Sequence, residues 1–226
     1  MLARHSLVWL SADGWQRAAQ TMAAMAAELS YQAALQRWQR HDWPVVLRRR
    51  EAGTPEDQLC LGLALPPDGN GNKTRIPFKA QLADVQRITD PLALRAALTH
   101  APPGWSGALN AFAGDCQQSG IAMRIYGSWA WQILTQQNYV RAGSDIDLLF
   151  APASVEEFTC GLGLLAQHAA RLPLDGEIVF AGGQAVAWKE CWQALQAGNQ
   201  QRVLVKTGDT VKLTPLAALM ATLEGT

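Results

Sequence analysis

Two aspartates separated by a single residue, Asp145 and Asp147, are the side chains whose type and spacing most clearly predict chemistry. The apolar residues around them predict a strand over residues 145–150, and strand residues two apart project from the same face. Two carboxylates side by side repel each other, and a divalent cation relieves that repulsion. Hard oxygen ligands suit Mg²⁺, which usually completes its coordination shell with waters and substrate phosphates. The pair therefore predicts a metal site for phosphate chemistry.

A glycine and a serine precede this pair, where a predicted strand over residues 121–125 leads into a predicted helix over residues 128–137. Gly127 would let the backbone approach a phosphate closely, and the free N–H groups of a helix start favour anions. Ser128 is placed to cap the helix and to offer its hydroxyl to a phosphate oxygen. An isolated Asp-x-Asp is most often a solvated strand end. Here the order strand, Gly-Ser, helix, acidic strand favours a phosphate-handling site instead.

The elements around these residues divide the chain into two predicted domains. Residues 1–88 combine an alanine-rich helix over 14–39 with short strands over 43–47 and 58–65, which predicts a small N-terminal α/β module. Residues 89–226 alternate helices with strands, which is typical of an α+β domain with a mixed sheet flanked by helices. The expected elements there include helices over 105–118, 155–171 and 215–223, strands over 177–180 and 203–206, and Thr214 as the last N-cap.

The composition narrows the class of partner. The 226 residues hold 19 lysines and arginines against 19 aspartates and glutamates, so the formal net charge is zero. A protein that grips long DNA or RNA normally has a basic excess, because phosphate contacts supply much of that affinity. No apolar run approaches the ~20 residues of a membrane helix, and the N-terminus lacks the apolar core of a signal peptide. The four cysteines are widely separated, as expected of reduced thiols in a cytoplasmic protein.

The central pattern resembles a known superfamily. Gly-Ser, a helix and then Ser-Asp-Ile-Asp-Leu-Leu are similar to the hallmark of nucleotidyltransferases with the polymerase β-like fold. The resemblance implies that fold for the catalytic domain and a third carboxylate from a later strand. In the stretch DGEIVF, Glu177 lies in the strand-like part and is favoured, and Asp175 is the reserve candidate. Asp145, Asp147 and Glu177 would then be the catalytic and metal-binding residues, with Mg²⁺ as the ion and Mn²⁺ as its alternative.

Further segments resemble one family within that superfamily. They are, in order, WPVVLRR at 43–49, GLALPP at 62–67, YGS at 126–128, SDIDL at 144–148 and DGEI at 175–178. This series is similar to the phosphoribosyl-dephospho-CoA transferases of malonate decarboxylase over essentially the whole chain. The resemblance implies transfer of the phosphoribosyl-dephospho-CoA group from triphosphoribosyl-dephospho-CoA to a serine of the acyl carrier subunit, with release of pyrophosphate. The expected partners are therefore this donor and the acyl carrier subunit, rather than a long nucleic acid or a membrane.

The implied reaction assigns roles to the other polar residues. Asp145 and Asp147 would hold the metal ions that bridge the α-phosphate and the leaving pyrophosphate. Gly127 and Ser128 would seat the pyrophosphate. Lys206 is the candidate to neutralise the rest of the triphosphate. The N-terminal module would bind the substrate or the carrier protein, and its candidates for the CoA phosphates or the carrier are Arg48, Arg49, Arg75 and Lys79. Each of these basic residues has the alternative role of a solvated surface charge.

Two other functions fit the same residues. A small nucleotidyltransferase that adenylylates a small molecule or a protein with ATP would use the Gly-Ser pair and the two aspartates in the same roles. A non-catalytic module would keep the fold and bind a nucleotide or a partner, although the intact aspartate pair counts against it. An ATP-dependent product on a test acceptor distinguishes the first alternative, and failure to bind Mg²⁺ distinguishes the second.

Overall fold

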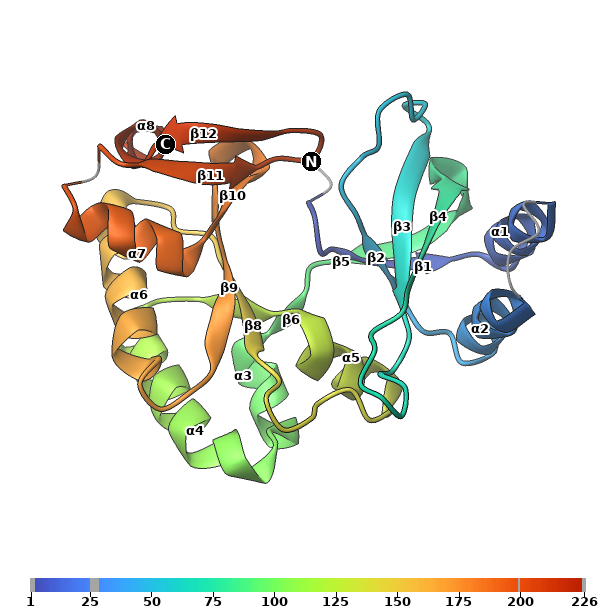
Figure 1. Ribbon diagram of the computed structural model, residues 1–226, viewed down its shortest axis with the longest axis horizontal. Coiled ribbons are helices and arrows are strands. Elements are labelled where there is room, and N and C mark those ends of the chain that lie inside the picture. Colours follow the sequence, from blue (N-terminus) through green and yellow to red (C-terminus); the bar gives the residue numbers. More distant parts are fainter. Residues whose placement is uncertain (1–2, 25–28, 199, 225–226) are drawn as a thin grey trace. The chain divides into compact units, whose positions relative to one another are not determined.

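The computed structural model describes residues 3–24, 29–198 and 200–224. These residues form eight α-helices, several short 3-10 turns and twelve strands in two sheets, so the predicted α+β class is confirmed. The chain divides into two compact units, which Figure 1 colours along the sequence. One unit is Met1–Pro91 with Leu134–Tyr139, and the other is Leu92–Ile133 with Val140–Thr226. Within the described residues, no helix combines the length and hydrophobicity that a membrane crossing requires.

The N-terminal unit is a five-stranded antiparallel sheet with two helices on one face. Its strand order is β4-β3-β2-β1-β5. The elements are β1 (Leu7–Leu10), α1 (Ala12–Ala24), α2 (Leu29–Arg40), β2 (Val45–Leu47), β3 (Gln58–Ala64), β4 (Arg75–Gln81) and β5 (Val85–Thr89). Alternate side chains of β3 and β4, such as Leu61 and Ile76, are fully buried and pack in one cluster with Trp38 of α2. The intervening side chains of β4, including Arg75 and Lys79, are therefore directed to the other face and are exposed.

The C-terminal unit is built on a seven-stranded mixed sheet with the order β12-β11-β10-β9-β8-β7-β6. Its strands are β6 (Leu92–Ala93), β7 (Met123–Ile125), β8 (Ile146–Phe150), β9 (Leu174–Phe180), β10 (Gln184–Ala187), β11 (Arg202–Lys206) and β12 (Val211–Pro215). Its helices are α3 (Leu94–Ala97), α4 (Pro103–Gln118), α5 (Gly127–Thr135), α6 (Val155–His168), α7 (Trp188–Gln196) and α8 (Leu216–Met220). Only the β8–β9 pair is parallel among the described strand pairs of this sheet, because α6 forms the crossover between them.

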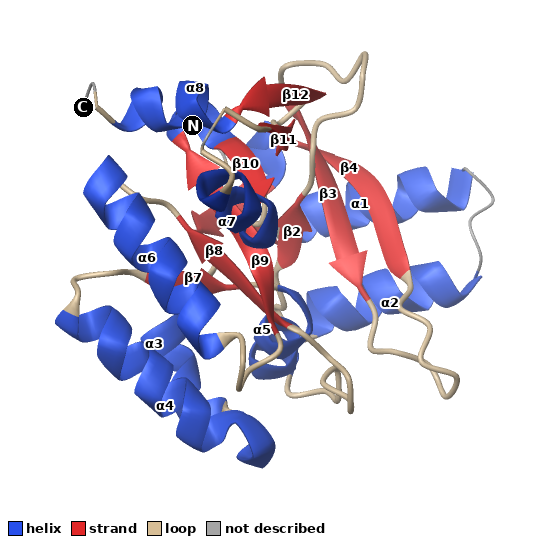
Figure 2. Cartoon of the chain, turned by 60° about the vertical axis from the view of Figure 1, so that its left-hand side comes forward, coloured by secondary structure: helices blue, strands red, loops and turns tan. Residues whose placement is uncertain are grey.

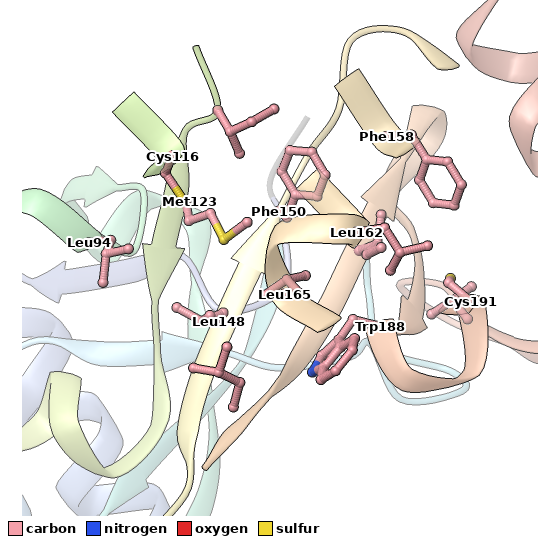
Figure 3. Close-up of a cluster of buried hydrophobic side chains, with 14 of the residues drawn as sticks. Leu94, Cys116, Met123, Leu148, Phe150, Phe158, Leu162, Leu165, Trp188 and Cys191 are labelled. Carbon is pink, nitrogen blue, oxygen red and sulfur yellow. The ribbon is translucent and has the colours of Figure 1, made fainter. Parts of the chain in front are cut away.

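Helices cover one face of this sheet and form the core of the C-terminal unit. Figure 2 shows α4 and α6 next to each other, and Figure 3 shows side chains of α6 packed on strand residues such as Leu148 and Phe150. Phe158 and Leu162 of α6 are fully buried in this cluster. Gly161 lies between them, and a Cβ at this position would overlap the ring of Phe150. Because α6 packs closely on one face of β8, only the alternate residues of this strand are directed to the other face of the sheet.

Two helix predictions in the first 140 residues differ from the structure. The helix predicted over residues 14–39 is two helices, α1 and α2, and residues 25–28 lie outside the described residues. Helix α5 begins at Gly127 and ends at Thr135, so Ser128 lies inside its first turn and is not its N-cap. The helix stops there because Gln136 takes a left-handed φ of 56°, which an α-helix cannot continue through.

The prediction that Thr214 caps the last helix is wrong. Thr214 lies in β12, paired with Val203, and the helix begins at Leu216, two residues later. The short segment 211–215 becomes a strand because β11 offers it a complete antiparallel partner. That partner is a tertiary feature which the segment itself does not encode.

Candidate active site

Four charged side chains lie on the sheet face that the helices leave uncovered. On β8 and β9 the core residues include Ile146, Leu148, Leu174 and Ile178, and on β11 they are Val203 and Val205. Because neighbouring strand residues point to opposite faces, Asp147, Asp175, Glu177 and Lys206 are directed to the other side of the sheet. The parallel register pairs Asp147 with Asp175, and Leu149 with Glu177. The strand order therefore places both candidate third carboxylates beside the predicted acidic strand, with Asp175 directly opposite Asp147.

The start of helix α5 contacts Asp147. The backbone N–H of Tyr126 donates to the carbonyl oxygen of Asp147 at 3.0 Å. Gly127 has a φ of +70°, and a Cβ built on it would lie only 2.6 Å from Asp147 Cγ. Glycine is required here on both counts, because other residues rarely adopt this φ and their Cβ would collide with the carboxylate. The Gly-Ser turn and Asp147 of the acidic strand therefore lie in direct contact.

Asp145 lies at the exposed end of a constrained turn, just before β8 begins. The Arg141 N–H donates to Ser144 Oγ at 2.9 Å, and the Ser144 N–H donates back to the Arg141 carbonyl at 2.9 Å. The Ile146 N–H then donates to the Pro173 carbonyl at 2.8 Å, which fixes the first residue of the strand. A hollow of about 370 Å³ adjoins this turn, with Trp105, Arg141, Gly143 and Pro173 among its lining residues. Asp145 is consequently held just before the first residue of β8 and is open to solvent.

Two lysines reach the carboxylates of β9. Glu177 is 7% exposed, and its Oε1 accepts a hydrogen bond from Lys206 Nζ at 3.1 Å. Asp175 Oδ1 lies 3.5 Å from Lys189 Nζ, a looser and more exposed pair. Lys206 is among the residues that the sequence predicts for the site, whereas no sequence signal marks Lys189, which belongs to helix α7. The structure therefore brings positive charge to each of the two carboxylates.

The acidic residues fit a metal ion that arrives with a phosphate substrate. Among the described residues, no three His, Cys, Asp or Glu side chains form a ready-made metal-binding cluster. Glu177 in particular sits opposite Leu149 and is engaged by Lys206. Mg²⁺ commonly uses only one or two protein carboxylates and takes its other ligands from water and substrate phosphates. Asp145 and Asp147, two residues apart and oxygen-rich, match that smaller ligand set.

The other predicted basic residues belong to the N-terminal unit. Arg48 Nη1 lies 3.3 Å from Glu51 Oε1, and Lys79 Nζ lies 3.4 Å from Glu51 Oε2. The Arg48 side chain lies over Gly62, where a Cβ would be 2.8 Å from Arg48 Cδ. Arg75 is exposed on β4, four residues before Lys79 and on the same face, and Arg49 is exposed beyond the end of β2. Arg48 and Lys79 therefore share Glu51 as their ion-pair partner, and Arg75 lies on the same face of β4 as Lys79.

Both units match models of one protein family. Residues 3–91 match the N-terminal domain of phosphoribosyl-dephospho-CoA transferase MdcG, and residues 92–217 match its C-terminal domain. A phosphoribosyl-dephospho-CoA transferase of Xanthomonas campestris pv. campestris (strain 8004) is 37% identical over 221 residues, which cover 97% of each chain. One from Bradyrhizobium diazoefficiens is 32% identical over 213 residues, covering 93% of this chain and 88% of the relative.

These matches span both units and the residues of the candidate site, and they place the chain among transferases. It belongs to the phosphoribosyl-dephospho-CoA transferase family. No solved structure shows a significant match to it.

Proposed function

We propose that this protein transfers the phosphoribosyl-dephospho-CoA group from triphosphoribosyl-dephospho-CoA to a serine of the acyl carrier subunit of malonate decarboxylase, with release of pyrophosphate. Family membership over nearly the whole chain supports the donor. The observation that carries the chemistry is the contact between Gly127 and Asp147, because it joins the Gly-Ser turn to the acidic strand. A mixed sheet with this strand, turn and helix order is consistent with a nucleotidyltransferase fold. The four free cysteines, three of them buried, are consistent with a cytoplasmic enzyme.

The proposed mechanism is an in-line displacement on the α-phosphorus of the donor. Asp145 and Asp147 would bind Mg²⁺, or Mn²⁺ as the alternative ion, which when bound stabilises negative charge on the transferring phosphate and the leaving pyrophosphate. Gly127 keeps Asp147 close to the start of α5, where backbone N–H groups favour phosphate oxygens. Ser128 would offer its hydroxyl to the same oxygens. These residues would bind and orient the donor so that the acceptor hydroxyl attacks opposite the pyrophosphate. The new P–O bond would form as the bond to pyrophosphate breaks, and Glu177 is the candidate to accept the hydroxyl proton.

The two carboxylates on β9, Asp175 and Glu177, would have different roles, one in metal binding and one in positioning a lysine. Asp175 is opposite Asp147 in the parallel register, so it supports the role of a third carboxylate beside the metal. Glu177 binds Lys206 at 3.1 Å, and this contact supports a role in aiming the lysine at a phosphate. Glu177 remains the alternative third metal ligand, because it lies two residues after Asp175 on β9 and on the same face of the sheet. Arg48, Arg49 and Arg75 of the N-terminal unit would bind phosphates of the CoA moiety.

Intact-mass spectrometry of the apo acyl carrier subunit tests this proposal. The subunit is incubated with the protein, Mg²⁺ and triphosphoribosyl-dephospho-CoA, and in a separate reaction with ATP. We expect a mass gain equal to phosphoribosyl-dephospho-CoA that disappears with EDTA and in the Asp145→Ala and Asp147→Ala variants. A gain of AMP would replace the function with adenylylation. No gain from either donor, together with no Mg²⁺ binding, would favour a non-catalytic module.

A further inference from the structure

The hairpin formed by β11 and β12 exposes large apolar side chains next to the candidate site. Leu204, Val211 and Leu213 are 39%, 47% and 53% exposed. The register pairs Leu204 with Leu213 and Val211 with Lys206, so all of these side chains share the sheet face that carries Glu177. Single exposed apolar residues are normal on protein surfaces, but a cluster of them marks an interaction site.

The hairpin is held rigidly in place. Val203 and Val205 are fully buried in the core on its opposite face. The Leu204 N–H donates to Glu190 Oε1 of helix α7 at 2.7 Å, and Arg202 Nη2 donates to the Leu213 carbonyl at 3.1 Å. A surface whose backbone is fixed in this way loses little conformational entropy when a partner binds. The exposed leucines are therefore a preformed surface.

The charges around the leucines indicate the chemistry of the partner. Residues 202–215 contain three basic residues, Arg202, Lys206 and Lys212, and one acidic residue, Asp209. Lys212 pairs with Val205, so its side chain is directed to the face opposite the leucines. Arg202 and Lys206 flank Leu204 on the same face, two positions away on either side. Lys206 is paired with Glu177, but within the described residues no carboxylate pairs with Arg202, and Asp209 accepts a hydrogen bond from Thr207 in the turn. An apolar centre with a basic rim is complementary to an acidic protein surface that presents apolar side chains.

We propose that this hairpin surface (Arg202, Leu204, Lys206, Val211 and Leu213) docks the protein that accepts the transferred group. The proposal rests on the proposed function, which makes the acceptor a protein. Lys206 connects the surface to the site, because its Nζ binds Glu177 while its backbone flanks the leucines. An acidic acceptor seated on Leu204 and Leu213 would thus present its neighbouring residues to the carboxylates on β8 and β9.

The docking surface is tested by measuring transfer kinetics while the concentration of the apo acyl carrier subunit is varied. The variants are Leu213→Ser and the double variant Leu204→Ser/Leu213→Ser. The matched control is Leu82→Ser, because Leu82 is 47% exposed in the N-terminal unit. We expect the double variant to raise the KM for the carrier about tenfold or more, with kcat and the KM for the donor within about twofold. The single variant should show a smaller effect in the same direction, and the control should show none.

Direct binding separates this proposal from the proposed function. Isothermal titration of the protein with the apo carrier, without donor, should give an affinity that falls with added salt and is lost in the double variant. If wild-type protein binds the carrier, the double variant does not, and no group is transferred, the docking surface stands and the proposed function fails. Unchanged carrier binding in a correctly folded double variant would overturn the docking surface. So would size-exclusion data in which the leucines only hold two copies of this chain together.

Discussion

At the scale of single residues, the space that a Gly127 Cβ would need is filled by the carboxylate of Asp147. A glycine before a helix is usually explained by access for a phosphate to the backbone. In this protein the absence of a side chain also lets an acidic strand approach the first turn of α5. The two ends of the motif are therefore coupled, and a change at Gly127 acts on Asp147 as well as on the helix start.

We predict that Gly127→Ala abolishes transfer, because the new Cβ must displace the Asp147 carboxylate. Adopting a positive φ should itself cost alanine about 1–2 kcal/mol of stability. Gly120→Ala is the matched control, since Gly120 has nearly the same φ of 69° but open space around the added Cβ. Thermal unfolding and the mass-spectrometric transfer assay should show a similar φ penalty in both variants but loss of activity only in Gly127→Ala. Equal activities would contradict the coupling of Gly127 to Asp147.

The two carboxylates of β9 should respond differently to neutral substitution. We expect Asp175→Asn to raise the Mg²⁺ concentration needed for half-maximal transfer about tenfold, because it removes negative charge opposite Asp147. Glu177→Gln should chiefly raise the KM for the donor, since it loosens the Lys206 side chain. Titrations of Mg²⁺ and of donor for both variants check this division. The opposite pattern would assign the third carboxylate to Glu177.

At the scale of elements, a buried carboxylate fastens helix α1 to the 3-10 turn Leu82–Asp84. Asp84 is 2% exposed and accepts a hydrogen bond from Arg17 Nε at 3.1 Å. Its backbone carbonyl accepts from the Ser11 N–H at 2.9 Å, and Gly14 leaves room for its Cβ. The hydrogen bond from Arg17 lowers the pKa of Asp84 below its usual range. A carboxylate that is more acidic in the folded state stabilises the fold while it is ionised.

This lowered pKa predicts how the stability of the protein depends on pH. The contribution of Asp84 should be complete above the unfolded-state pKa of about 4 and should disappear as the pH falls through the lower folded-state pKa. Asp84→Asn should therefore lower the free energy of unfolding by about 1–2 kcal/mol near neutral pH and by less in acid. The loss is small because the Arg17 side chain is exposed to solvent. Urea unfolding at several pH values measures the difference. Glu56→Gln, which removes an exposed carboxylate of the same unit, should leave the free energy of unfolding near neutral pH unchanged.

At the scale of the whole molecule, the chain crosses between its two units more than once. The segment Leu134–Tyr139 groups with Met1–Pro91, although the residues before and after it belong to the C-terminal unit. Tyr139 is 3% exposed, and its hydroxyl donates to the Ala64 carbonyl at 2.7 Å. Burial raises the pKa of Tyr139 far above its ordinary value, so the phenol stays protonated and keeps this bond. A short segment that begins with the last two residues of α5 thus completes the N-terminal unit.

Tyr139→Phe should destabilise the protein by about 1 kcal/mol, because it leaves a buried carbonyl oxygen without its donor. Tyr31→Phe is the control, since within the described residues the Tyr31 hydroxyl makes no hydrogen bond. Chemical denaturation of the two variants compares their free energies of unfolding. A Tyr139→Phe variant as stable as wild type would show that the segment is held by packing alone.

Local patterns in the sequence were sufficient for the α+β class, for the acidic strand and for the turn that precedes helix α5. Each depends on neighbours in the chain: alternation of apolar residues predicts β8, and a glycine after a strand predicts the break before α5. The family resemblance carried by these motifs is confirmed by the family models. Phosphate and metal binding by Gly127, Ser128, Asp145 and Asp147 could be proposed for the same reason, since motif spacing is a local property.

Other features depend on residues that are distant in the sequence, and only the tertiary structure decides them. Strand register places Asp175 opposite Asp147 and Glu177 opposite Leu149, whereas the sequence alone favours Glu177 because it lies in the strand-like part of the segment. Lys206 meets Glu177 because β9, β10 and β11 are adjacent in the sheet, although 29 residues separate them. Thr214 enters a strand because β11 supplies its partner. The sequence by itself determined which side chains could do chemistry, and hydrogen bonding between strands decided which of them meet.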